Sequence, residues 1–523
     1  MNEFTARELT AQLTAAESYL IITVDNRVPI DRDILCRTVA WHNRPDPVEA
    51  LRRHLTFYLS DTAAEKVLRQ LPMTDLQPHL AEREMRLTDR LARRVSQAHQ
   101  DGTSLDDAIS SLGLGARRQI EDWFSKDPSI SDVSFLLACA VLGGCAYSTV
   151  STHAAQIEHL LAEVSRVELT QNPQPLTRSR SERLSAVMAK LGSGLVNTEF
   201  GASVTETVAL ESTPLVRAIL DVVWHEYPLI VEALLLWILE AGDDRDADVR
   251  VRVAFAAGQL AEYDFTTVRG RLLLPWAKSE RVGPRGTAAF ALGVPAATDT
   301  TAGQVLGLLH HWATVRNPGL VWTATEAYGS YVGLMFPHIA MSELLSVVIH
   351  GDGQSADVTR SVRRLFLLGG RQDPTIAPVV LAGLVDWLQR DLRPAPQVAR
   401  CIFVDLLTTA GSPQQWDARA VYAQLTNEPS RVHASALLGR CLAHKDSQPR
   451  TLEALRRLLA VADTDQDIND SLQELVVAAV VTDPPDPRAL QRMAFHLNLW
   501  QSRSRTSLSA GRLLTRILKE TQS

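Results

Sequence analysis

Residues 246–258 read Asp-Ala-Asp-Val-Arg-Val-Arg-Val-Ala-Phe-Ala-Ala-Gly, an acidic turn that leads into a helix of small and apolar residues. Turns followed by a valine-like anchor recur 33 to 40 residues apart, at Asp248-Val249-Arg250, Arg281-Val282-Gly283, Gly319-Leu320-Val321, Asp357-Val358-Thr359, Gln397-Val398-Ala399, Arg431-Val432-His433, Asp467-Ile468-Asn469 and Arg505-Thr506-Ser507. Another amphipathic helix precedes the anchor, as at 379–392 and 451–461. This period predicts stacked two-helix units, an α-solenoid, over residues 212–523.

The segment Asp246–Gly258 closely resembles the consensus of HEAT repeats, in which Asp-x-x-Val-Arg precedes an Ala-rich helix. Units between Gly319 and Ile468 keep the period, but most lack the arginine. The unit at Thr506 lacks both the Val-Arg pair and the Ala run, as expected of a capping repeat. The resemblance implies that the helix carrying the pattern lines the concave side of the array.

Nine arginines lie in these helices and are candidate protein-binding residues: Arg250, Arg252, Arg285, Arg360, Arg363, Arg364, Arg400, Arg440 and Arg512. One interpretation is a basic inner strip that attracts an acidic segment of a partner protein. The alternative is that each arginine pairs locally with Asp or Glu at the turns between helices and contributes little.

Residues 131–211 form a second predicted unit, in the order of a winged helix. The expected elements are helices at Phe135–Leu142, His153–Val164 and Glu182–Leu191 and strands at Leu195–Phe200 and Val204–Leu210. DNA binding is one interpretation, but the second helix carries Gln156, Glu158, His159 and Glu163 instead of the cations that contact phosphates. We therefore expect a winged-helix-like packing module.

The pattern of residues 1–60 predicts a short remnant of an α/β domain. Tyr19-Leu20-Ile21-Ile22-Thr23-Val24 has the length and β-branched content of a core strand, and the break Arg44-Pro45-Asp46-Pro47 opens a helix at Val48. Residues 61–130 predict a helical linker region. Its dense charge at 82–86 and 89–94 could be a basic patch for nucleic acid, but acidic residues interleave, which favours a solvated helix face.

The whole chain also resembles the C-terminal part of large actinobacterial P-loop NTPases of the signal-transduction type. The matching pieces are 19–24 as a final core strand, Leu51-Arg52-Arg53-His54-Leu55 after it, and Val223-Trp224-His225-Glu226-Tyr227-Pro228 before the repeats. The sequence departs from that family because it has no Gly-x-x-x-x-Gly-Lys-[Ser/Thr] loop, whose backbone amides cradle the phosphates. No ATP-binding residue follows from the resemblance.

The sequence contains no recognisable catalytic constellation, and we expect neither an enzyme nor a cofactor or metal. Five cysteines are scattered without a CxxC pair, which is typical of small buried hydrophobes in a reducing compartment. His310 and His311 are adjacent, so on a helix their rings diverge and cannot share a metal ion. Asp243-Asp244-Arg245-Asp246 lacks the glycine of a calcium loop and reads as a loop and helix cap. Most of the ten tryptophans should lie between helices.

Composition limits the function further. The chain has 523 residues, 46% hydrophobic and 22% charged, with a net charge of −7, and its longest apolar run, 229–239, is too short to span a bilayer. We therefore expect a cytoplasmic protein with no membrane partner. Because its net charge is negative, we also expect no nucleic-acid partner. The predicted function is a non-catalytic scaffold or sensor of bacterial signalling or defence. The alternatives are one half of an NTPase whose nucleotide-binding part lies on another chain, and a winged-helix DNA-binding regulator.

Overall fold

The computed structural model describes residues 46–71, 73, 76, 85–105, 116–165, 179–198, 201–350, 355–390, 393–412, 418–481, 487–503 and 508–520. This described part is almost entirely helical, and its only strands are β1 (Ala189–Thr198) and β2 (Gly201–Leu210). The prediction of a mainly α protein is confirmed. The strand predicted at Tyr19–Val24 lies outside the described residues.

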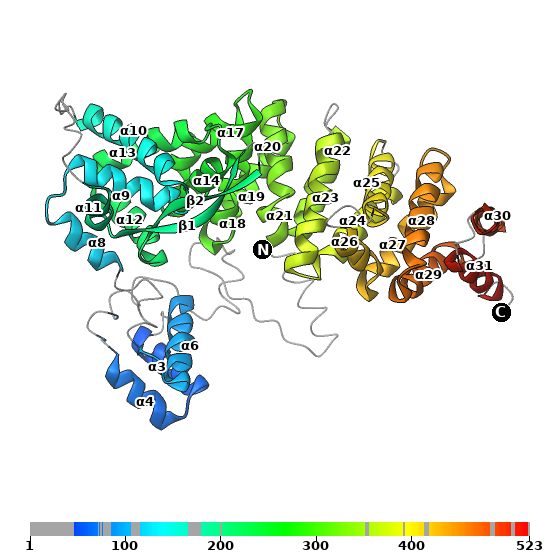
Figure 1. Cartoon of the computed structure of the whole chain (residues 1–523), viewed down its shortest axis with the longest axis horizontal. Coiled ribbons are helices and arrows are strands. Elements are labelled where there is room, and N and C mark those ends of the chain that lie inside the picture. Colours follow the sequence, from blue (N-terminus) through cyan, green and yellow to red (C-terminus); the bar gives the residue numbers. More distant parts are fainter. Residues whose placement is uncertain are drawn as a thin grey trace, which may run out of the picture. The chain divides into compact units, whose positions relative to one another are not determined.

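The chain divides into two compact units, residues 1–115 and 116–523. This division falls inside the predicted linker region 61–130, and the segments 131–211 and 212–523 lie in the same unit. The first unit contains α3 (Pro47–Tyr58), α4 (Asp61–Gln70) and α6 (Met85–Asp101), which share a small apolar core that includes Leu55, Val67 and Leu91 (Figure 1). Asp46 caps α3 by accepting hydrogen bonds from the backbone N–H groups of Val48 and Glu49.

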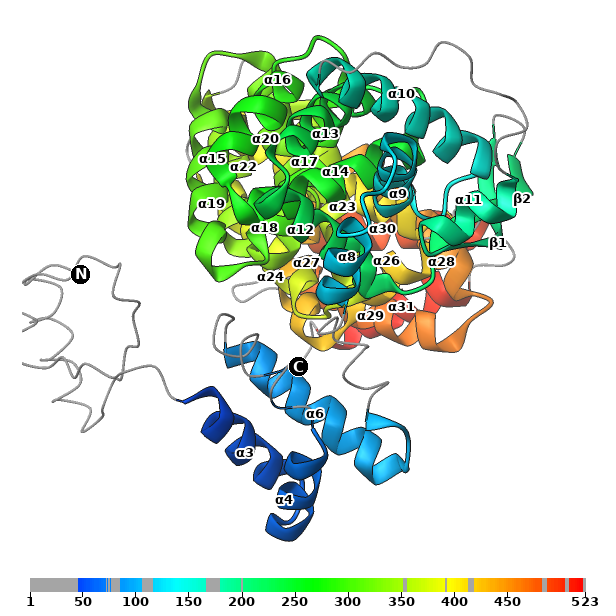
Figure 2. The same ribbon diagram turned by 90° about the vertical axis from the view of Figure 1, so that its left-hand side faces the viewer.

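The second unit begins with helices around the β-hairpin. They are α8 (Ala116–Phe124), α9 (Ile130–Leu142), α10 (Tyr147–Ser165), α11 (Arg180–Ala186) and, after the hairpin, α12 (Thr213–Glu226). The strands pair antiparallel from Ala189↔Leu210 to Thr198↔Gly201, and β1 contacts α11 (Figure 2). Gly144, with a φ of +91° that suits glycine, donates its N–H to the carbonyl oxygen of Val208 at 2.6 Å. This bond ties β2 to the turn between α9 and α10.

The hairpin is longer than the sequence predicted. The third helix was expected to continue to Leu191, but α11 ends at Ala186 and β1 begins at Ala189, six residues before the predicted strand. Between them Met188 adopts a φ of +54°, which no helix accommodates. The pairing of Ala189 with Leu210 then draws the intervening residues into the ladder. Local helical periodicity does not report this long-range pairing.

Helix pairs follow over the rest of the chain. Their first members are α13 (Pro228–Ala241), α16 (Leu274–Ala277, which continues from α15, Phe265–Val268, and the π-helix η1, Arg269–Leu273), α19 (Asp299–Thr314), α22 (Pro337–His350), α24 (Ile376–Gln389), α26 (Ala418–Thr426), α28 (Gln448–Ala462) and α30 (Pro487–Arg503). Their second members are α14 (Ala247–Tyr263), α17 (Val282–Ala291), α20 (Pro318–Tyr328), α23 (Ser355–Gln372), α25 (Ala395–Ala410), α27 (Glu428–Ala443), α29 (Gln466–Val480) and α31 (Leu508–Glu520). Two short helices, α18 (Gly293–Ala296) and α21 (Tyr331–Met335), lie in the connections.

The second helices form an unbroken row. α14 contacts α17, and the contacts continue through α20, α23, α25, α27 and α29 to α31, while each second helix also packs against the first helix of its own pair (Figure 1). The predicted anchors from Val249 to Ile468 lie near the beginnings of these second helices, and the anchor at Thr506 lies outside the described residues. Asp246 caps α14 as predicted, accepting a hydrogen bond from the N–H of Asp248 at 2.8 Å.

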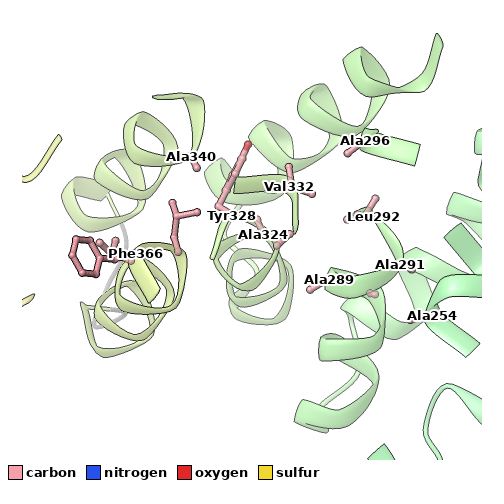
Figure 3. Close-up of a cluster of buried hydrophobic side chains, with 14 of the residues drawn as sticks. Ala254, Ala289, Ala291, Leu292, Ala296, Ala324, Tyr328, Val332, Ala340 and Phe366 are labelled. Carbon is pink, nitrogen blue, oxygen red and sulfur yellow. The ribbon is translucent and has the colours of Figure 1, made fainter. Parts of the chain in front are cut away.

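Small side chains allow the second helices to approach closely. Figure 3 shows Ala254, Ala289 and Ala291 in one part of the core, while the larger Tyr328 and Phe366 fill another part of it (Figure 3). Gly258 of α14 faces α17 and α18: a Cβ atom at this position would lie 2.5 Å from the carbonyl oxygen of Ala291 and 2.8 Å from Cβ of Val294. Backbone and a β-branched side chain cannot yield easily, so this contact requires glycine.

Gly258→Ala is therefore expected to lower the free energy of unfolding by roughly 1–3 kcal/mol through overpacking. Gly307→Ala is the matched control, because Gly307 is also in a helix and a Cβ atom there would meet nothing within 4 Å. That control should raise stability by about 0.5–1 kcal/mol through helix propensity. Thermal and urea unfolding measure both changes, and equal signs for the two variants would contradict the close packing of α14.

Candidate interaction surface

Two of the predicted arginines hold loops next to their own helices. Arg250 Nη1 donates hydrogen bonds to the carbonyl oxygens of Asp244 at 2.6 Å and Arg245 at 3.1 Å. The Arg285 guanidinium donates to the carbonyl oxygens of the preceding turn and lies 4.9 Å from the ring centroid of Trp322. Both guanidinium groups thus make contacts within the protein.

Arg252 is a structural bridge. Its Nη1 donates to the carbonyl oxygen of Gly143, 109 residues earlier in the chain, and so joins α14 to the turn after α9. The nearby Cys145 thiol is buried, and burial raises its pKa while the charge of Arg252 opposes the shift. This part of α14 is a joint between the hairpin-bearing helices and the helix pairs.

The three arginines of α23 are engaged as well. Arg360 pairs with Asp357 one turn before it, and Arg363 contacts Asp405 on α25. Arg364 reaches back to α20, where its Nη1 lies 2.7 Å from a carboxylate oxygen of the buried Glu326. Only the Arg360–Asp357 pair is local in sequence, whereas Arg363 and Arg364 pair with carboxylates on other helices.

The remaining arginines differ in exposure. Arg400 is half-buried near Cys441, whose pKa is raised by burial to about 12 in spite of that positive charge. Arg440 is exposed, and Arg512 is exposed and donates to the neutral side chain of Gln466 at 2.9 Å. Binding of a partner by these arginines stays a prediction. Arg250, Arg252, Arg285 and the α23 group, however, already hold partners within the chain.

A different surface emerges from exposed apolar side chains, which we call the apolar strip: Val251 and Phe255 of α14 with Tyr331 and Met335 of α21. Their exposed fractions are 38%, 41%, 43% and 37%. The ring centroids of Phe255 and Tyr331 lie 6.1 Å apart at an interplanar angle of 64°, an edge-on contact. Each pair of residues is one helical turn apart, so the strip crosses from one helix to the other.

Glycine makes this crossing possible. A Cβ atom at Gly293 would lie 2.8 Å from Cβ of Tyr331, so the absence of a side chain there lets α21 lie close to α18. Large apolar groups held at an exposed position by such packing are typical of surfaces that bind other proteins. The apolar strip is therefore a candidate surface for binding a partner protein.

Phe255 lies on the exposed side of α14, although it stands within the run of small and apolar residues that begins this helix. On a period of 3.6 residues, Val251 and Phe255 fall opposite Val249 and Val253, both of which are fully buried. The helical spacing of these four residues could therefore have predicted from the sequence that Val251 and Phe255 are exposed. The other two residues of the strip, Tyr331 and Met335, come from α21, about 80 residues further along the chain. This short helix lies in the connection between α20 and α22.

The buried histidine His153 and the buried cysteines have structural roles in the described part of the chain. His153 is buried; Trp237 Nε1, which can only donate, lies 3.3 Å from His153 Nδ1, and Asp244 Oδ2 lies 3.6 Å from Nε2. Burial lowers the pKa of His153, so the neutral ring persists and accepts the indole hydrogen bond. Burial raises the pKa of the Cys139 thiol to about 12, which keeps it protonated and unreactive. Among the described cysteines, only Cys401 is exposed, and Cys36 lies outside the described residues.

Among the described residues, no three or more His, Cys, Asp or Glu side chains form a group able to hold a metal ion. His310 contacts Glu343 at 3.0 Å. None of the described helices combines the length and the apolar character that crossing a membrane requires. Trp237, Trp312 and Trp387 are fully buried, as predicted for inter-helix tryptophans, and Trp416 lies outside the described residues.

No known protein family and no curated protein matches this chain.

Proposed function

We propose that the protein is a non-catalytic scaffold whose helix pairs form a HEAT-like α-solenoid, and that it binds a partner protein over the apolar strip. The observation that supports this proposal is the unbroken row of second helices from α14 to α31. Such a row exposes a long surface of regular helices, which suits the binding of an extended partner. The order α9, α10, α11, β1, β2 supports a winged-helix-like module packed before the solenoid.

The exposed part of the hairpin favours packing or protein contact over DNA binding. Leu195 and Val204 are a cross-strand pair, 72% and 71% exposed, where a DNA-binding wing would present cations to phosphates. The resemblance to signal-transduction NTPases suggests a role in bacterial signalling or defence. In that role the chain would supply the partner-binding surface.

The apolar strip has features expected of a binding surface. Phe255 and Tyr331 offer large rings whose orientation is restrained by their mutual contact, so their burial by a partner loses little conformational entropy. Aromatic side chains that become fully desolvated at the centre of an interface commonly dominate its binding energy. Val251 and Met335 extend the apolar area on either side.

Site-specific photocrosslinking in the native host tests this proposal. A benzophenone amino acid at position 331 or 255 is expected to give one discrete crosslinked protein, which mass spectrometry identifies. The control position is Val432, which is 69% exposed on α27 and lies outside the apolar strip. Equal crosslinking at all three positions, or none at 255 and 331, would contradict binding at the strip.

With the purified partner, Phe255→Ala and Tyr331→Ala are each expected to weaken binding by about tenfold or more, which corresponds to at least ~1.4 kcal/mol. Val432→Ala should leave the affinity unchanged. Both aromatic residues are about two-fifths exposed, so their loss should destabilise the fold less than the loss of a fully buried ring would. Titration calorimetry and thermal unfolding of the same samples separate lost contacts from lost folding.

A further inference from the structure

The last 37 residues of the sequence, which include the last helix pair, have a net charge opposite in sign to that of the rest of the chain. Residues 487–523 contain six arginines and one lysine but only one glutamate, a net charge of +6. The whole chain has a net charge of −7, so the preceding 486 residues carry the difference between −7 and +6, which is −13. Charge asymmetry of this size indicates a local surface for an anionic partner, which the balance of the whole chain conceals.

This pair, α30 and α31, is held firmly by its apolar face. α31 packs against α28, α29 and α30, with Ala510, Leu513 and Ile517 buried in the contact (Figure 1). Met493 and Leu497 of α30 are buried as well. The buried side of each helix therefore fixes the pair in place.

Cations follow the outward face of α31. Arg512 and Lys519 are exposed and share this face with Leu508 and Thr515, at a spacing of three and four residues. The contact between Arg512 and Gln466 involves a neutral group, so it leaves the positive charge uncompensated. Arg516 pairs with Glu520 at 3.2 Å, but both side chains are about two-fifths exposed, and such a pair is easily exchanged for a phosphate.

Aromatic rings lie on the neighbouring helix. The ring centroids of Phe495 and His496 are 5.4 Å apart, and those of His496 and Trp500 are 5.9 Å apart. Phe495 is 63% exposed. Burial lowers the pKa of His496, which therefore presents a neutral aromatic ring at pH 7. Arg492 lies one turn before these rings and is exposed.

We propose that the α30–α31 pair binds single-stranded nucleic acid, with Arg512, Arg516 and Lys519 on the phosphates and Phe495 stacked on a base. Arginine suits this partner because its planar guanidinium binds phosphate through paired hydrogen bonds and also stacks on bases. Sequence-independent binding of single strands combines these two features, a cationic surface and exposed aromatic rings. This activity is additional to the proposed protein-binding function and does not depend on it.

Other occupants fit the surface less well. A second copy of the chain would bring two segments of net positive charge together, which is repulsive. Insertion into a membrane surface needs a continuous apolar stripe, but Leu508 and Leu518 are separated by cations on α31. An acidic peptide would use the cations but not the exposed ring of Phe495.

Fluorescence anisotropy with a 5′-labelled 20-nucleotide oligo-dT tests the proposal on the full chain. Binding is expected at 50 mM NaCl and should weaken steeply toward 200 mM, because bound phosphates release counterions. The variant Arg512→Glu/Arg516→Glu/Lys519→Glu should lose at least tenfold in affinity. Phe495→Ala should lose about fivefold with an unchanged salt dependence, since stacking is not ionic.

The matched control reverses three exposed cations elsewhere, Lys126→Glu/Lys278→Glu/Arg316→Glu, and changes the net charge equally. It should retain most of the binding, and circular dichroism with thermal unfolding verifies the fold of each variant. Absence of wild-type binding at 50 mM NaCl, or equal losses in the two triple variants, would overturn the proposal. It would equally be overturned if poly-glutamate bound as tightly as oligo-dT, or if vesicles with 30% phosphatidylserine bound while oligo-dT did not.

Discussion

Val253→Asp is expected to lower the free energy of unfolding of the second unit by about 4 kcal/mol or more. Val253 is fully buried on the face of α14 that carries Val249 and Leu260. An ionised carboxylate there has no water around it, and a protonated one leaves a polar group without a partner among apolar side chains. Because each helix pair depends on its neighbours, the damage should extend to the pairs packed on α14. Urea unfolding followed by circular dichroism measures the loss.

Val251→Asp is the control for this prediction. Val251 lies on the opposite face of the same helix and is 38% exposed, so a carboxylate there stays hydrated. We expect a change within about 0.5 kcal/mol. Equal unfolding midpoints for the two variants would mean that the helix phase of α14 is wrong. If the apolar strip binds a partner, Val251→Asp should weaken that binding without loss of stability.

The succession of helix pairs could be predicted from the sequence more reliably than the side of each helix that is buried. The anchors Val249, Leu320 and Val358 are buried, but Val282 is 58% exposed and Val432 is 69% exposed. In α17, Pro284 and Thr287 occupy the buried positions, so the contact face begins two residues after the anchor. A single valine in the first turn of a helix can be either buried or exposed, and the packing of the neighbouring helix pair decides between the two.

The interaction surface was less accessible to sequence reasoning than the fold. Arginines at a recurring position form a basic strip only if no carboxylate lies within reach. The carboxylate can come from another helix far away in sequence, as Glu326 does for Arg364, 38 residues later. The position of Tyr331 likewise depends on its close approach to Gly293, which no local pattern reports. The charge asymmetry of 487–523, in contrast, is present in the sequence and is hidden only when the charge is summed over the whole chain.

Arg364→Glu is expected to destabilise the second unit by about 3 kcal/mol, although it changes a residue that sequence analysis placed on a binding surface. Its partner Glu326 has a side chain only 11% exposed, and loss of the arginine leaves that buried carboxylate facing a second one. Arg360→Glu is the matched control on the same helix. Arg360 is 55% exposed, so a carboxylate there stays hydrated, and its pair with Asp357 contributes little; we therefore expect less than about 1 kcal/mol. Thermal unfolding compares the two variants. Arg364→Gln should also destabilise the unit, because it leaves the buried Glu326 carboxylate without its partner, and the double variant Arg364→Gln/Glu326→Gln should recover part of that loss. Equal destabilisation by Arg364→Glu and Arg360→Glu would show that the pair between α20 and α23 does not contribute to stability.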